Sequence, residues 1–219
     1  MKAVYVDHKQ QQFFNVENLA LTYYGKKLRW NGLHVENNLV KHLYGIMMWD
    51  EIYYDRVPHV FQSSFQFGPL DFYEPDFYLH RKDIIDRKLQ RLRLMSNQQI
   101  KDYFMKEYEK NKGFHNILVN WDNLKLTPFR MAAIAYCMGG KLLAMFFSKL
   151  AEDFKNWSYG MPDLVLWRED KKMIKFVEVK SETDNLSEKQ KCWLVNITNE
   201  GVECDLCWIT DKIEGVDVF

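Results

Sequence analysis

The sequence has little of what marks secreted, membrane-spanning or disulfide-linked proteins. Its 219 residues include 5 prolines, 10 glycines and 4 cysteines. No uninterrupted apolar run approaches the ~20 residues of a membrane span, and the first residues lack the apolar core of a secretory signal. Four cysteines do not indicate a disulfide framework in a chain of this size. We therefore expect a soluble intracellular protein without a membrane partner.

Zinc chemistry is also poorly supported. Cys204 and Cys207 form a CxxC, but no second pair completes a zinc site. They lie in a stretch with the pattern of a strand, where positions i and i+3 point to opposite faces, so we expect both to be structural. His34 and Glu36 form an H-x-E, which with a later CxxC is a feature of zinc deaminases. Here the CxxC comes far downstream and lacks a preceding proline, so that interpretation fails.

What the sequence does contain is a large apolar fraction and an uneven distribution of charge. Apolar residues make up 47% and aromatic residues 16%, which is typical of a folded globular protein. The net charge is 0, yet residues 81–112 hold ten Lys and Arg against five Asp and Glu, whereas residues 160–219 hold eight against thirteen. This asymmetry suits a metal-gathering site beside a surface for polyanions. Two solvated faces that differ by chance explain it equally well.

Helical patterns dominate the chain before Gly160. Apolar spacing, with cap signals at Asn15 and Thr127, predicts helices over residues 14–24, 35–54, 81–111, 127–137 and 141–156. The aromatic-rich residues 55–80, interrupted by proline and glycine, are predicted to form an irregular connection. In the basic helix over 81–111, we expect an inward face made of Ile84, Ile85, Leu89, Leu92 and Leu94.

The pattern changes after Gly160. The runs "DLVLW" and "IKFVEVK", joined by "REDKK", predict a β-hairpin. A helix capped by Ser187 over 187–199 should then cross to a strand at "GVECDLCWI" that pairs in parallel. The expected fold class is α/β, a mixed sheet flanked by helices with an N-terminal helical portion. Because no linker or repeat is evident, residues 1–219 are predicted to form one domain, mainly helical over 1–157 and with its core at 158–219.

The hairpin brings three charged residues to one end. Asp163 begins the first strand and should lie opposite Glu178 near the end of the second, with Lys180 on the same face as Glu178. Two carboxylates and an ammonium that converge on a partly buried face can hold a divalent metal beside a water molecule. That is the chemistry of phosphodiester hydrolysis. An ordinary exposed hairpin remains the alternative, because a proline-aspartate followed by E-x-K is a short pattern.

Longer motifs extend this pattern. "GMPDLVLW", "FVEVKSETDNLSEKQKCWL" and "GVECDLCWI" resemble the virus-type replication-repair nuclease domain of the PD-(D/E)xK superfamily. Upstream, "LHVENNLVKHLYGIMMWDEIYYDRVPHVFQSSFQFGPLDFY" and "LAEDFKNWSYGMPD" are similar to the catalytic region of the Fanconi-associated nucleases. The resemblance runs from about residue 15 to residue 209, with motifs in the same order and spacing. It implies a restriction-endonuclease-like fold.

The resemblance also implies roles for individual residues. The metal ligands would be Glu36 on the N-terminal helix, Asp163, Glu178 and the backbone carbonyl of Val179. Lys180 would orient or activate the attacking water. By itself Glu36 would be interpreted as a solvated or capping residue at a helix start.

Other positions match the family more loosely. Asp184 and Gln190 would order the site or touch the DNA backbone, although Asp184 suits a turn equally well and Gln190 could simply support Lys180. Gln66 and Asp71 match a connecting segment near the site. Phosphate contacts are expected from the basic helix, against the alternative of a solvated face, through Arg81, Lys82, Arg87, Lys88, Arg91 and Arg93.

The implied activity is that of a structure-specific DNA nuclease that uses Mg²⁺ or Mn²⁺. It would cut branched or 5′-flap DNA in repair such as interstrand crosslink repair, with possible 5′-to-3′ exonuclease action. Two alternatives stay open: a Holliday-junction-resolving nuclease, and a DNA-binding module that is inactive without partner domains. The family's chains are longer, so further domains of a longer chain are expected. A monomer is favoured, nuclear in a eukaryote and otherwise cytoplasmic. Tyr159 stands where some relatives carry an arginine, which puts one backbone contact in doubt.

Overall fold

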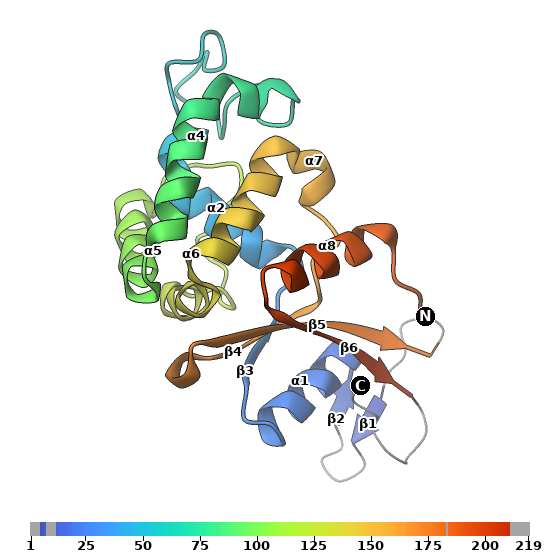
Figure 1. Cartoon of the computed structure of the whole chain (residues 1–219). Helices are drawn as coiled ribbons and strands as arrows, with labels where there is room; N and C mark the ends of the chain where they lie inside the picture. Colours follow the sequence, from blue (N-terminus) through green and yellow to red (C-terminus); the bar gives the residue numbers. More distant parts are fainter. Residues whose placement is uncertain (1–4, 8–11, 183, 211–219) are drawn as a thin grey trace. The chain divides into compact units, whose positions relative to one another are not determined.

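The computed structural model describes residues 5–7, 12–182 and 184–210, and the chain divides into two compact units (Figure 1). Unit 1 combines Met1–Asn37 with Gly160–Phe219, and unit 2 is Asn38–Tyr159. The N-terminal residues thus group with the sheet and not with the helices that follow them. A single domain over residues 1–219 stays a prediction.

Unit 1 is built around a four-stranded sheet in the order β3-β4-β5-β6. The first two pairs are antiparallel and the β5–β6 pair is parallel, so the predicted hairpin and the predicted return through a helix are both confirmed. β3 was not predicted. The elements of unit 1 are β1 (Tyr5–Asp7), β2 (Gln12–Phe14), α1 (Val16–Lys26), β3 (Asn31–His34), β4 (Leu164–Arg168), the 3₁₀ turn η1 (Glu169–Lys171), β5 (Met173–Ser181), α8 (Glu188–Asn199) and β6 (Glu203–Ile209).

Helices cover both faces of this sheet, with α1 on one side and α8 on the other (Figure 1). On the α1 face, Ala20 and Tyr24 pack in a buried cluster with alternate residues of β4, β5 and β6, including Val177 and Val179. The predicted caps are confirmed: Asn15 accepts a hydrogen bond from the N–H of Asn18, and Ser187 accepts one from the N–H of Gln190. Strand alternation therefore leaves Glu178 and Lys180 on the opposite face, the one covered by α8.

The approach to β4 depends on a glycine. Gly160 has φ +84°, a conformation that side chains strongly disfavour. A Cβ there would also lie 2.8 Å from the Cβ of Lys189 in the first turn of α8. The chain can therefore pass closely beneath α8 and deliver Asp163 to the start of β4 only because residue 160 has no side chain.

Unit 2 is helical, and the structure corrects several predicted boundaries. The predicted helix over 35–54 is two helices, and the one over 81–111 is broken at Ser96, whose capping box starts a second helix. Ile85, Leu89 and Leu92 are buried as expected, but Leu94 is 87% exposed and does not face inward. The elements are α2 (Asn38–Met47), α3 (Trp49–Ile52), α4 (Asp76–Leu94), α5 (Asn97–Asn111), α6 (Pro128–Glu152) and α7 (Phe154–Trp157).

The two helices predicted on either side of Gly139 and Gly140 are confirmed: α6 begins at the predicted Thr127 cap and consists of two helical segments joined by a kink at Gly139, whose φ of 69° and ψ of 171° are not helical. A Cβ on Gly140 would lie 1.8 Å from the carbonyl oxygen of Leu92, so the glycine allows α6 and α4 to pack closely. Among the described residues, α6 has the length of a membrane span, and an 18-residue stretch of it has a mean hydropathy of 1.5. However, 78% of that stretch is buried inside the protein. It is the central helix of the core of unit 2.

Candidate active site

The β4–β5 hairpin sets the first part of the site. Leu164 pairs with Val177, which puts Asp163 opposite Glu178, as the sequence predicted. The carboxylate of Asp163 accepts a hydrogen bond from the backbone N–H of Val179 at 2.8 Å. Asp163 is therefore fixed across the end of the hairpin and is only partly exposed.

Glu178 and Lys180 lie side by side on the face of β5 that α8 covers. Their exposed fractions are 1% and 7%, so both charges are largely withdrawn from water. Lys180 Nζ lies 2.8 Å from Oε1 of Glu178. The second oxygen, Oε2, is buried and has no hydrogen-bond partner among the described residues. A buried carboxylate oxygen without a partner is costly in an ordinary core, so this one is available to a ligand.

Gln190 in the first turn of α8 links these two charges. Its Nε2 donates to Oε1 of Glu178 at 2.5 Å, and its Oε1 lies 3.3 Å from Nζ of Lys180. The same Oε1 accepts from the backbone N–H of Ser187 at 2.9 Å, which completes the capping box of α8. Gln190 thus holds the orientation of both charged side chains, in agreement with the interpretation of it as a support for Lys180.

Crowded carboxylates shift the acidity of this site. Burial raises the pKa of Glu178 to about 7, the charge of Asp163 adds to the rise, and the hydrogen bond from Lys180 opposes it. Burial also raises the pKa of Asp163; the N–H of Val179 lowers it and the charge of Glu17 raises it further. Carboxyl groups whose pKa is raised by burial, with a neighbouring carboxylate adding to the rise, are typical of functional sites.

Two residues that sequence reasoning missed join Asp163 on its other side. One ligand atom each from Glu17, His34 and Asp163 lie within 4.8 Å of one another. Glu17 is in the first turn of α1, and His34 ends β3 beside Leu164. Oε2 of Glu17 is also buried without a hydrogen-bond partner among the described residues. In the sequence, the only signal was the position of Glu17 just after the Asn15 cap signal. The structure shows that Glu17 and His34 lie at the ends of elements that meet at one edge of the sheet.

Glu36 does not lie on a helix, which corrects the prediction. It occupies the turn between β3 and α2 with φ 45°, and its backbone N–H donates to the carbonyl of Asp163 at 3.3 Å. Its side chain is half exposed, with Oε1 3.2 Å from Nε2 of His34. The turn therefore places Glu36 next to His34 at the border of the site. That Glu36 and the carbonyl of Val179 are metal ligands stays a prediction.

The donor set fits a divalent cation. The carboxylates of Glu17 and Asp163 and the imidazole of His34 are groups that bind such ions, and Oε2 of Glu17 is buried without a partner among the described residues. Glu178, whose Oε2 is likewise buried without a partner, lies opposite Asp163 across the hairpin. The mutual repulsion that raises the pKa of Glu178 would be relieved by a positive charge at this position. The site therefore has the chemistry of a metal-binding centre.

Asp184 has a local role in the turn after β5. Its Oδ2 accepts hydrogen bonds from the backbone N–H and the hydroxyl of Ser181 at 2.9 and 2.7 Å. These bonds lower the pKa of Asp184. The geometry is that of the turn alternative, and a contact of Asp184 with DNA stays a prediction.

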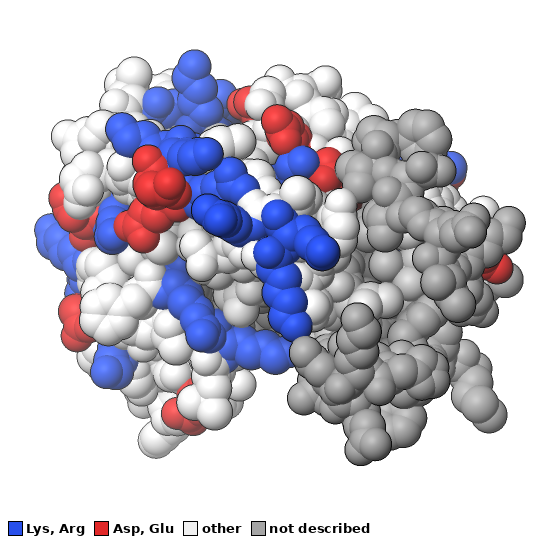
Figure 2. Space-filling view, turned by 90° about the horizontal axis from the view of Figure 1, so that it is seen from below, with Lys and Arg blue, Asp and Glu red and all other residues white. Residues whose placement is uncertain are grey.

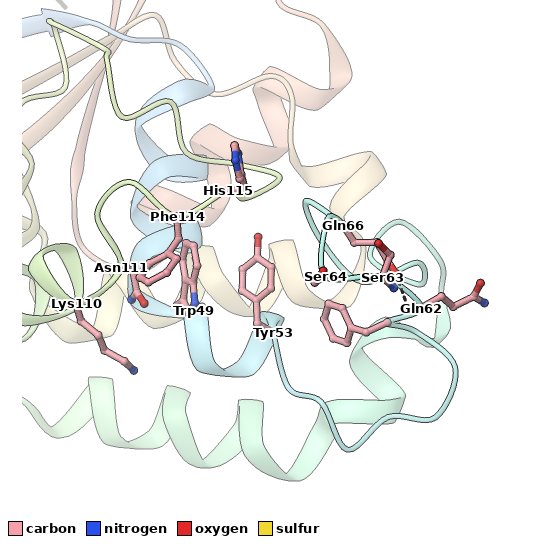
Figure 3. A pocket seen from close by; sticks show the side chains of 11 residues that line it. Trp49, Tyr53, Gln62, Ser63, Ser64, Gln66, Lys110, Asn111, Phe114 and His115 are labelled. Atoms are coloured by element: carbon pink, nitrogen blue, oxygen red, sulfur yellow. Dashed lines mark hydrogen bonds between the residues drawn. The ribbon is translucent and has the colours of Figure 1, made fainter.

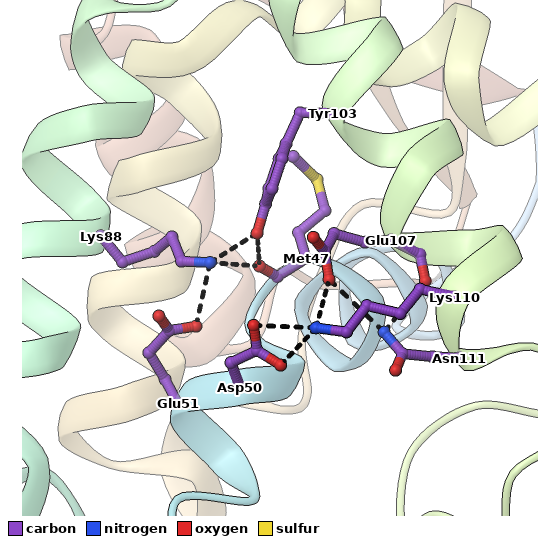
Figure 4. Close-up of polar contacts among 8 residues, drawn as sticks. All are labelled: Met47, Asp50, Glu51, Lys88, Tyr103, Glu107, Lys110 and Asn111. Atoms are coloured by element: carbon purple, nitrogen blue, oxygen red, sulfur yellow. Dashed lines mark hydrogen bonds and ion pairs between the residues drawn. The ribbon is translucent and has the colours of Figure 1, made fainter.

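Several basic-helix residues and their neighbours in unit 2 are committed to internal contacts. Arg81 is fully buried and forms a bidentate pair with Asp71 at 2.7 and 3.0 Å, so the prediction that Arg81 contacts phosphates is wrong. Lys88 is 11% exposed and lies 3.2 Å from Glu51, which excludes a free phosphate contact there too (Figure 4). Gln66 binds the backbone of its own loop through four hydrogen bonds.

Four basic side chains are exposed on α4, and their contact with phosphates stays a prediction: Lys82, Arg87, Arg91 and Arg93. Lys82 pairs with Asp86, whereas Arg87 donates to the backbone of its own helix, to the carbonyl of Asp83 at 2.9 Å, and has no carboxylate partner among the described residues. The guanidinium of Arg91 lies over the ring of Tyr103. These side chains retain free donors that a phosphate could use.

The mixed four-stranded sheet, flanked by helices and with an acidic cluster and a lysine at one end of its central hairpin, defines a restriction-endonuclease-like fold. The family model of the VRR-NUC domain matches residues 95–209, more than half of the chain. The chain belongs to the VRR-NUC domain family.

Individual relatives carry this comparison further. The Fanconi-associated nuclease 1 homologues of Arabidopsis thaliana and Dictyostelium discoideum are 39% identical over 197 residues and 37% identical over 210 residues. Human Fanconi-associated nuclease 1 is 32% identical over 196 residues. These alignments cover 88%, 90% and 89% of this chain but 21%, 19% and 19% of the relatives. The chain thus spans about a fifth of the length of the curated relatives it matches.

Solved structures confirm the fold class. Two crystal structures of paFAN1 match with TM-scores of 0.74 and 0.73 at 24% identity. They are bound to gapped DNA with 5′ flaps of 2 nucleotides and 1 nucleotide, respectively. The matches cover 90% and 89% of this chain and 35% of each solved chain. At this level of identity the likeness shows the fold.

Proposed function

We propose that this chain is a metal-dependent DNA nuclease that hydrolyses phosphodiester bonds. The observation that carries the proposal is the convergence of Asp163, Glu178 and Lys180 at one end of the β4–β5 hairpin, where Glu178 and Lys180 are buried and Asp163 is partly buried. Membership of the VRR-NUC family and the relatives named as nucleases support it. Glu17 and His34 beside Asp163 complete a set of cation-binding groups.

The proposed cofactor is Mg²⁺ or Mn²⁺. Glu17, His34 and Asp163 would hold it, with Glu178, Glu36 and the carbonyl of Val179 as the further ligands that the family resemblance implies. When bound, the cation would supply positive charge against the oxygens of the scissile phosphate. Because Mg²⁺ prefers oxygen ligands, a direct contact from the His34 imidazole would favour Mn²⁺.

The chain's own residues would position the reacting water. Lys180 is held by Glu178 and Gln190, so its ammonium can donate a further hydrogen bond in one defined direction. A water oriented there would attack phosphorus: its oxygen would form the new phosphorus–oxygen bond and lose a proton, the ester bond would break, and the leaving oxygen would gain a proton, so that the proton count balances. The low exposure of Lys180 and Glu178 strengthens their electrostatic effect on that step.

The proposed substrate is branched DNA such as a 5′ flap, as in repair of interstrand crosslinks. Support comes from the names of the relatives and from the flap DNA in the matching solved structures. Arg87 and Arg91 on α4 are exposed candidates for phosphate contacts. Figure 2 shows Lys and Arg side chains exposed at the surface in the view from below. A monomer, further domains in a longer chain and a nuclear location in a eukaryote are part of the proposal.

The test is cleavage of an end-labelled 5′-flap DNA by this chain with Mg²⁺, Mn²⁺ or EDTA, beside Lys180→Ala. We expect incision with either metal, none with EDTA, and a loss of at least about 100-fold in the variant. A four-way junction is the matched competing substrate.

Cleavage that persists in EDTA or in Lys180→Ala would contradict the proposal. Preferred cleavage of the junction would support the resolving nuclease instead. DNA binding without incision under every metal condition would identify a binding module.

A further inference from the structure

A groove of about 850 Å³ in unit 2 lies apart from the carboxylate site in the sequence and is lined wholly by residues of unit 2. Its walls come from α3, the segment of residues 61–66, the end of α5 and the residues just after it (Figure 3). Trp49 and Tyr53 lie between Lys110 on one side and the 62–66 segment on the other. No function described above uses this aromatic groove.

Three aromatic rings form its floor. The ring centroids of Trp49 and Tyr53 are 4.5 Å apart with an angle of 31° between the planes, and those of Tyr53 and Phe61 are 6.4 Å apart at 28°. All three are partly exposed. Tyr53 therefore lies against Trp49 on one side and beside Phe61 on the other, and the partly exposed Phe61 ends the row, where a flat aromatic ligand can extend the stack.

The floor is rigid before any ligand binds. The hydroxyl of Tyr53 donates to the carbonyl of Phe67 at 2.7 Å and accepts from the N–H of Ile117 at 3.2 Å. The amide of Gln66 ties its own loop to the backbone at Gln62 and Val60. Because these contacts already order the groove, binding would cost little conformational entropy.

The rim is polar, and its one fully charged side chain is a cation. The exposed side chains of Gln62 and Ser64 form no hydrogen bond with the described residues, so they can bind the edge of a ligand. Lys110 stands at the mouth, held by Asp50 at 2.7 Å and Glu107 at 3.5 Å, and is 47% exposed (Figure 4). No carboxylate lines the groove itself.

We propose that the aromatic groove binds unpaired bases of single-stranded nucleic acid, which rests on and deepens the proposed nuclease function. A base face would stack on the exposed part of Phe61 at the end of the row, base edges would bond to Gln62 and Ser64, and Lys110 would face a phosphate of the strand. A lipid chain or an apolar helix would desolvate the polar rim without partners, and a cationic ligand would meet no lining carboxylate.

The test measures binding in EDTA, where cleavage is absent. A fluorescent single strand of about eight nucleotides, a length that single-stranded-DNA-binding folds cover, is titrated with the wild type, Phe61→Leu and Phe61→Tyr. The Leu variant keeps apolar volume but loses the ring, and we expect a Kd about tenfold higher, restored in Phe61→Tyr. Phe129→Leu is the matched control, because Phe129 is 77% exposed and does not line the groove. Thermal unfolding verifies that each variant is folded.

Equal Kd values for the wild type and Phe61→Leu, or no binding by the wild type, would overturn the proposal. So would a mononucleotide that binds as tightly as the strand, since the groove would then hold a single nucleotide. The groove proposal and the nuclease proposal can fail independently. Flap cleavage together with an unchanged Kd in Phe61→Leu would refute only the proposal that the groove binds single strands. Phe61-dependent binding without any cleavage refutes only the nuclease.

Discussion

The two units differ in what surrounds their buried charges. In unit 2, Arg81 places both terminal nitrogens on Asp71, and Lys88 lies 3.2 Å from Glu51 (Figure 4). Each buried charge there faces one of opposite sign. In unit 1, Glu178 has Lys180 at 2.8 Å but also meets the negative charge of Asp163, which in turn meets that of Glu17. Burial, with these neighbouring carboxylates adding to it, raises the pKa of Glu178 and of Asp163.

This difference separates structural charges from functional ones. A paired buried charge is strongly destabilising to break, because its partner is left uncompensated. A crowded set of carboxylates costs folding free energy in the chain alone, and only a bound cation would recover it. Four predictions test whether the difference holds, taken from the largest expected effect to the smallest.

Breaking a pair in unit 2 should have the largest effect on stability. Arg81→Ala leaves the Asp71 carboxylate without its bidentate partner and removes the guanidinium packed on the Phe77 ring. We expect a loss of about 3–5 kcal/mol in the free energy of unfolding, measured by urea denaturation. The control Arg87→Ala changes an exposed arginine on the same helix and should stay within about 0.5 kcal/mol of the wild type. A small effect at Arg81 would show that this charge pair of unit 2 does not stabilise the fold, which would contradict the comparison.

Neutralising a carboxylate in unit 1 should leave the stability of the chain unchanged or raise it. Asp163→Asn keeps an oxygen that can accept the N–H of Val179 but relieves the repulsion with Glu17 and Glu178. We expect an unchanged or higher Tm in EDTA and a loss of at least about 100-fold in flap cleavage. Mn²⁺ should raise the Tm of the wild type and not that of the variant. A variant that is less stable in EDTA would show that Asp163 is a structural charge.

The third prediction concerns pH. The pKa of Glu178 is raised to about 7 in the folded chain from an ordinary value of 4.5, so the folded state binds more protons between those values. Metal-free stability should therefore fall as pH rises from 4.5 to 7. Glu178→Gln should flatten this slope, leaving the part due to Asp163, whose pKa is also raised. Urea denaturation in EDTA across this range measures both slopes, and identical slopes would contradict the crowding argument.

The parts of the fold and site that follow local rules could be predicted from the sequence. Strand alternation put Glu178 and Lys180 on one face, and the short turn put Asp163 opposite Glu178. The caps at Asn15 and Ser187 were readable because a cap depends on the next three residues. β3 was missed because it is a four-residue edge strand that contains a glycine and shows no alternation.

What escaped prediction depends on contacts between distant segments. Glu17 and His34 lie near Asp163 because α1 packs on the sheet and β3 pairs with β4. In the sequence, β4 comes only after the whole of unit 2. Arg81 lies on a basic helix, and nothing in its sequence pattern marks it as buried against Asp71 across an irregular segment. The resemblance to a nuclease family located Glu36, but not the turn in which it lies.

The smallest expected effect separates support of the site from support of a helix. Gln190→Ala removes the bond to Glu178 and also breaks the capping box of α8. We expect cleavage to fall about tenfold and stability by about 1 kcal/mol. The matched control is Ser187→Ala, which removes the hydroxyl that accepts from the N–H of Gln190 but leaves the Gln190 side chain on Glu178. It should cost a similar amount of stability and leave cleavage unchanged. An equal loss of cleavage in both variants would mean that Gln190 acts through the stability of α8, whereas a loss confined to Gln190→Ala assigns it to positioning Glu178 and Lys180.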